Sequence, residues 1–194
     1  MTAFGPYLSG CLLLLLAGAA KLVRPHDTAR ALALRTGRGS LRGWSAAVRS
    51  GGAVELVLGA GAAAMPGRPL ALAVAGSYAA FALYVADARR RGGPLATCGC
   101  FGDPDTPATA LHLMANMGLA LAAGLVAFAR PAATLPAVLA HEPFDGVPLL
   151  AAAIVLTGLF LVALTAAARL QGVRTRSSAL AATVVTPGPD RSPG

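Results

Sequence analysis

The sequence predicts an all-α polytopic membrane protein with five membrane-spanning helices. The chain has 194 residues, of which 56% are apolar and only 12% are charged. Soluble domains carry about 25% charged residues, so this chain has too few polar groups to cover a surface exposed to water. The apolar content excludes a disordered chain, and three cysteines are too few for a disulfide-stapled secreted module.

Five apolar stretches are long enough to cross a hydrocarbon layer, which takes roughly 20 mostly apolar residues. Proline or glycine stands at nearly every border. A cleaved signal peptide is disfavoured for the first stretch, because residues 1–10 contain no lysine or arginine. The second stretch is the weakest because Glu55 lies inside it. The stretches run from about Pro6 to Val23, Ala46 to Met65, Leu70 to Ala86, Ala108 to Phe128 and Val147 to Ala168.

The connecting segments differ in character. The first, from Arg24 to Ser45, fits either a short basic amphipathic helix on the membrane surface or a solvated basic loop. The last segment, residues 171–194, is rich in proline near its end and predicts a disordered cytoplasmic tail. Small residues such as Gly59, Gly61, Gly118 and Ala122 are expected where helices pack closely.

The basic residues predict the orientation of the chain. With the N-terminus outside and the C-terminus in the cytoplasm, fourteen of the sixteen lysines and arginines lie on the inner side, and only Arg68 and Arg130 lie outside. The net charge of +8 is then a property of a cell-membrane protein, and it requires no nucleic-acid partner.

The motif with the clearest chemistry is Thr97–Gly102, which contains Cys98, Gly99 and Cys100. Two thiols separated by one glycine can close a small disulfide ring, since glycine adopts unusual backbone angles at low cost. Strained disulfides are readily reduced, and the nearby arginines favour the reactive thiolate. A redox pair, a pair of metal ligands and a turn with inert thiols all remain compatible with the motif. Cys11 lies in the outer half of the first helix, whereas the cysteine pair is expected on the inner side. Cys11 is therefore expected to be a buried apolar residue.

Four polar residues in the apolar stretches are further candidates. Glu55 can pair with Lys21, either to fix the first helix against the second or to carry protons for thiol chemistry. His112 is either a base that accepts a thiol proton or a hydrogen-bonding residue between helices. Asn116, four residues later on the same helix face, is expected to bond to a neighbouring helix.

Around the cysteine motif the chain resembles a known family. The run Arg89–Gly102 is similar to the signature of the MauE family, which consists of small polytopic membrane proteins of the DoxX-like group. Ala17–Leu22, followed by Pro25, resembles the glycine–lysine end of that group's first helix. Val54–Gly59 resembles its acidic second helix, and Asn116 falls where the fourth helix carries an asparagine.

The resemblance covers roughly residues 5–130 and implies a DoxX-like four-helix transmembrane bundle over residues 1–130. An outer loop and a fifth transmembrane helix are then expected within residues 131–170. The resemblance also implies a role in protein maturation. MauE proteins are associated with making the disulfide-rich small subunit of methylamine dehydrogenase, alongside a thioredoxin-like partner.

The leading functional hypothesis is therefore a thiol–disulfide maturation factor in which Cys98 and Cys100 cycle between dithiol and disulfide. Its expected partners are the lipid bilayer and a thioredoxin-like protein, with no cofactor and no metal. Two alternatives remain open. One is a non-enzymatic membrane anchor or chaperone, and the other is a protein that binds a quinone or small solute in a pocket at Glu55.

Overall fold

The computed structural model describes residues 3–37, 39–65, 67–91, 108–129 and 135–185, and every regular element in these ranges is an α-helix. The predicted all-α class is therefore confirmed. The helices are α1 (Phe4–Val23), α2 (Pro25–Thr36), α3 (Leu41–Ala64), α4 (Arg68–Arg91), α5 (Ala110–Phe128), α6 (Leu135–His141) and α7 (Pro143–Val185).

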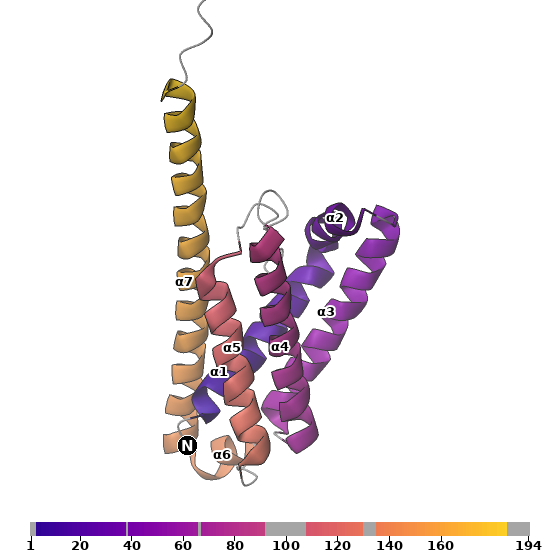
Figure 1. Ribbon diagram of the computed structural model, residues 1–194. Coiled ribbons are helices and arrows are strands. Elements are labelled where there is room, and N and C mark those ends of the chain that lie inside the picture. The colour runs from indigo at the N-terminus through magenta and orange to yellow at the C-terminus, as the bar shows by residue number, and fades with distance from the viewer. Residues whose placement is uncertain (1–2, 38, 66, 92–107, 130–134, 186–194) are drawn as a thin grey trace, which may run out of the picture.

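The long helices α1, α3, α4, α5 and α7 lie lengthwise beside one another and alternate in direction (Figure 1). The short helix α2 lies across one end of this bundle, and α6 lies at the opposite end, near the N-terminus. Helix α1 is the central element, because it packs against α2, α3, α5 and α7. Helices α4 and α5 form a second closely packed pair.

Four helices in the described part of the chain are long and apolar enough to cross a membrane. They span Phe4–Val23, Arg68–Arg90, Ala110–Phe128 and Phe144–Leu170. The second expected stretch also forms a helix of the bundle, since α3 has 24 residues and is about 36 Å long at 1.5 Å per residue. It falls outside the apolar set because it contains Arg49, Glu55 and several glycines. Together these findings define a multi-pass membrane protein.

The connecting segments are more helical than the sequence predicted. Two predictions were open for the first connection, and the helix is confirmed as α2. This helix has Pro25 in its first turn, and it ends before Gly37, which adopts the left-handed conformation (φ 61°). Helix α7 continues to Val185, so residues 171–185 are helical instead of forming the start of a disordered tail. The remaining residues of that tail, 186–194, lie outside the described ranges. Helix α6 was not anticipated in the segment before the last long helix.

Glycines bring α1 and α3 unusually close together. A Cβ atom added at Gly18 would lie 2.6 Å from the carbonyl oxygen of Gly52, and one added at Gly52 would lie 2.9 Å from the carbonyl oxygen of Gly18. Near the other end of the contact, a Cβ at Gly59 would lie 2.7 Å from the carbonyl oxygen of Cys11. Only glycine fits at these positions, because the opposing atoms belong to the backbone and cannot move aside.

Hydrogen bonds from buried side chains also join α1 to α3, α4 and α7. Tyr7 donates a hydrogen bond to the carbonyl of Ala62 on α3 (3.0 Å), and Tyr78 of α4 donates one to the carbonyl of Gly10 (2.6 Å). Ser9 donates to the carbonyl of Ala153 on α7 (3.1 Å). Cys11 is free and fully buried among these groups, as the sequence predicted. Each of these bonds satisfies a polar hydroxyl away from water, which makes the packing of α1 specific as well as close.

The glycine contact predicts an asymmetry between two alanine substitutions. Gly18→Ala places a methyl group against the backbone of Gly52, so we expect it to lower the free energy of unfolding by about 1–3 kcal/mol. Gly118 of α5 has no atom within 4 Å of its Cβ position, so Gly118→Ala is the matched control and should be neutral or slightly stabilising. Unfolding of the purified variants in mixed micelles measures both. Equal effects of the two substitutions would contradict the close contact.

Candidate functional site

An ion pair between α1 and α3 is the first component of the site. Lys21 lies in the last turn of α1, and its Nζ donates a hydrogen bond to Oε1 of Glu55 in the middle of α3. Each side chain is only 12% exposed. The pair that the sequence suggested is therefore present, and it brings together two charges that would each be costly alone at membrane depth.

The same glycines that join α1 and α3 position this pair. Gly18 and Gly52 each stand three residues before a charged residue of the pair, which is one turn along the same helix face. The ammonium of Lys21 also lies 5.2 Å from the centroid of the Phe81 ring of α4, a cation–π contact. The second carboxylate oxygen of Glu55, Oε2, is buried without a hydrogen-bond partner among the described residues. Within the described part of the chain, one acceptor of the pair is thus unused.

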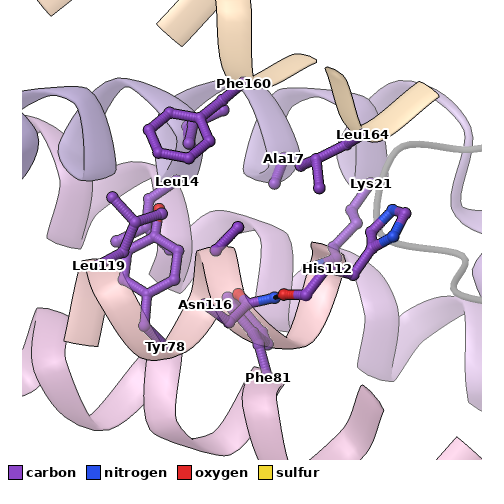
Figure 2. Close-up of a pocket in the computed structure, with 12 residues that line it drawn as sticks. Leu14, Ala17, Lys21, Tyr78, Phe81, His112, Asn116, Leu119, Phe160 and Leu164 are labelled. Carbon is purple, nitrogen blue, oxygen red and sulfur yellow. Dashed lines mark hydrogen bonds between the residues drawn. The ribbon is translucent and has the colours of Figure 1, made fainter. Parts of the chain in front are cut away.

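A small cavity lies beside Lys21, between α1, α4, α5 and α7 (Figure 2). Its volume is about 40 Å³, which is room for a few water molecules at roughly 10–15 Å³ each. Glu55 is not among the residues that line it, so this cavity is distinct from the pocket expected at Glu55. The cavity is lined by apolar and aromatic side chains together with Lys21, His112, Asn116 and Tyr78.

His112 is held at the start of α5 by a capping arrangement. Thr109 is the N-cap residue; its hydroxyl accepts from the backbone N–H of His112 (3.3 Å) and lies 2.8 Å from Nδ1 of the imidazole. The backbone N–H of Thr109 donates to the same Nδ1 (3.4 Å). Because Nδ1 accepts, a neutral His112 carries its proton on Nε2. The ring is only 4% exposed and is one of the groups that line the cavity.

Asn116 lies one turn further along α5 and also lines the cavity (Figure 2). Its amide Nδ2 donates to the carbonyl of His112 (2.7 Å), so this bond lies within α5. The expected hydrogen bond to a neighbouring helix was therefore wrong for this donor. The physical reason is that Asn116 faces the cavity, where the nearest acceptor is the carbonyl four residues earlier in its own helix.

The cysteine pair, Cys98 and Cys100, lies outside the described residues. On either side of it, Val85 and Ala88 near the end of α4 are fully buried and form one apolar cluster with Ala108, just before α5. Among the described residues, no group of three or more His, Cys, Asp or Glu side chains could hold a metal ion.

Sequence reasoning missed the aromatic part of the site. Phe81 and Tyr78 of α4 line the cavity, as does Phe160 of α7. A tyrosine and a phenylalanine three residues apart on one helix face are a signal that could have indicated this site. Which partner helix they would face does not follow from local spacing.

The fold and the site together define a polytopic α-helical membrane protein with a buried ion pair beside a small polar cavity. The chain matches the family described as methylamine utilisation protein MauE over residues 2–130, which is most of its length. It therefore belongs to the MauE family, as the cysteine motif and the helix matches indicated. No curated protein and no solved structure matches it.

The cap of α5 predicts the effect of removing one hydroxyl. Thr109→Val keeps the side-chain volume but removes the cap and a partner of the imidazole, so we expect a loss of about 1 kcal/mol in the free energy of unfolding. Thr165→Val is the control, since that exposed hydroxyl bonds only to carbonyls of its own helix (2.8 and 3.0 Å). Denaturation of both variants in detergent measures the difference between their free energies of unfolding. If Thr109→Val were no more harmful than Thr165→Val, the cap would have no role in placing His112.

Proposed function

We propose that this chain is a membrane thiol–disulfide maturation factor in which Cys98 and Cys100 form the redox pair. The observation that carries the proposal is the position of the pair in the chain. The segment that contains it joins the end of α4 at Arg91 to the start of α5 at Ala110, and the apolar cluster of Val85, Ala88 and Ala108 packs these two helix ends together. His112 lies in the first turn of α5.

The chemistry is a balanced exchange with a second dithiol pair. A thiolate of the reduced Cys98–Cys100 pair attacks the disulfide of a thioredoxin-like partner and forms a mixed disulfide, releasing one partner thiolate. The second cysteine then attacks the mixed disulfide, closes the Cys98–Cys100 bond and releases the partner as a dithiol. Two electrons and two protons pass to the partner, and the reverse sequence reduces the pair again.

In this proposal Nδ1 of His112 accepts and returns the thiol proton, and it gives up its long bond from the backbone N–H of Thr109 (3.4 Å) while it is protonated. The support is its position at the start of α5 beside a cavity that has room for water, which could carry a proton between imidazole and thiol. Glu55 is a second proton acceptor, through the carboxylate oxygen that has no partner among the described residues. Lys21 and Asn116 hold these groups in place. Two closely spaced thiols exchange directly with a second dithiol pair, so we favour protein thiols as the exchange partners.

Family membership supports a link to methylamine utilisation. We propose the small subunit of methylamine dehydrogenase as the client, a thioredoxin-like protein as the partner, and kinship with the DoxX-like group. For the orientation we propose an outer N-terminus and a cytoplasmic C-terminus, supported by the distribution of basic residues.

Thiol mapping tests the proposal. Membranes are equilibrated with glutathione at several ratios of oxidised to reduced form, and free thiols are counted by the mass shift of a membrane-impermeant maleimide added from either side. In wild type and in Cys11→Ser, we expect two thiols to disappear together as a Cys98–Cys100 disulfide. In Cys98→Ser, the remaining Cys100 should instead become a mixed disulfide with glutathione.

The function itself is tested by growth on methylamine in a strain that lacks the native gene. Cys98→Ser and Cys100→Ser should fail to restore growth while inserting normally, and Cys11→Ser should restore it. Full growth with either serine variant would reject the redox role and favour a membrane anchor that docks its partner without thiol chemistry.

A further inference from the structure

We propose that the corner between α1, α2 and α3 is a binding site for the headgroups of anionic phospholipids. Four arginines define this surface, which we call the arginine corner. They are exposed in the structure: Arg24 at the end of α1, Arg30 on α2, and Arg42 and Arg49 on α3. The inference goes beyond the proposed function, because it involves neither the cysteines nor the cavity.

The charge of this corner is strongly unbalanced. Residues 24–49 contain six arginines and a single acidic residue, Asp27. Among the described residues, none of the four arginines of the corner forms an ion pair. The nearby carboxylate of Glu55 is already paired with Lys21. Among the described residues, the corner therefore presents cations that have no paired counter-charge.

Apolar side chains stand among these arginines. Val23 is 77% exposed, Leu34 is 69% exposed and Leu41 is 53% exposed. Arg30 and Leu34 are four residues apart and share one face of α2. A nucleic acid or an acidic protein would neutralise the charge but would leave these side chains in water. The boundary between headgroups and acyl chains accommodates both kinds of group.

The corner is also held rigidly at the end of the bundle. Helix α2 lies across that end (Figure 1). Its inner face is fixed on α3, because Ala29 is fully buried and His26 Nδ1 lies 3.2 Å from the hydroxyl of Ser45. The face that carries Arg30 and Leu34 is left pointing outwards. The backbone positions that carry these arginines are therefore already in place, so binding a phosphate group does not have to order a helix.

The only tryptophan of the chain reports on this site. Trp44 lies in the first turn of α3, two residues from Arg42. The protein is reconstituted in phosphatidylcholine vesicles that contain a small, equal fraction of either dibromo-phosphatidylglycerol or dibromo-phosphatidylcholine. Quenching of Trp44 fluorescence then gives the relative affinity of the corner for the two headgroups at about 0.1 M salt.

We expect phosphatidylglycerol to be preferred about fivefold or more, since each arginine near a charged surface contributes on that order. Arg30→Gln together with Arg42→Gln should reduce the preference at least fivefold. Arg68→Gln, at the opposite end of the bundle with its guanidinium 5.0 Å from the Phe128 ring centroid, is the matched control and should leave the preference unchanged. Unquenched emission identical to wild type in pure phosphatidylcholine shows that a variant is folded.

Three results would overturn the proposal. One is equal quenching by the two lipids in the wild-type protein. Another is an unchanged preference in the Arg30→Gln, Arg42→Gln variant. The third is loss of the preference on adding inorganic phosphate at constant ionic strength, which would identify a site for free phosphate in place of a lipid headgroup.

Discussion

The close approach of α1 to α3 is the constraint on which the rest of the structure depends. Backbone meets backbone at Gly18 and Gly52, and this contact brings Lys21 within bonding reach of Glu55. Because the two charges neutralise each other, α3 can remain in an apolar bundle even though it is not among the helices apolar enough to cross a membrane. The side chain of Lys21, held in this position, in turn lines one side of the cavity, and His112 and Asn116 of α5 also line it.

The polar groups of the bundle are therefore not scattered. Lys21, Glu55 and His112 gather towards the end at which α4 and α5 are joined by the segment that carries Cys98 and Cys100. Elsewhere in the core, the hydroxyls of Tyr7, Ser9 and Tyr78 donate hydrogen bonds to backbone carbonyls across helix contacts.

Features governed by local sequence could be predicted. The apolar spans and the Lys21–Glu55 pair follow from hydropathy, spacing and the cost of isolated charges, whereas the sequence left a helix and a loop equally open for the first connection. Features that depend on which helices face each other could not. Gly118 was expected at a helix contact and has open space instead, whereas the contact of Gly18 with Gly52 was not anticipated. The cavity and the aromatic rings beside it were missed for the same reason, because they are assembled from four separate helices.

A double-mutant cycle on Lys21 and Glu55 tests the central claim most directly. Lys21→Met leaves a buried carboxylate without its partner, so the single variant should lose about 3–5 kcal/mol of unfolding free energy in bilayer-like micelles. Adding Glu55→Gln removes the stranded charge, so the account predicts that the double variant is more stable than Lys21→Met alone. If the two substitutions instead destabilise the protein additively, the pair does not hold α1 on α3 and the account is contradicted.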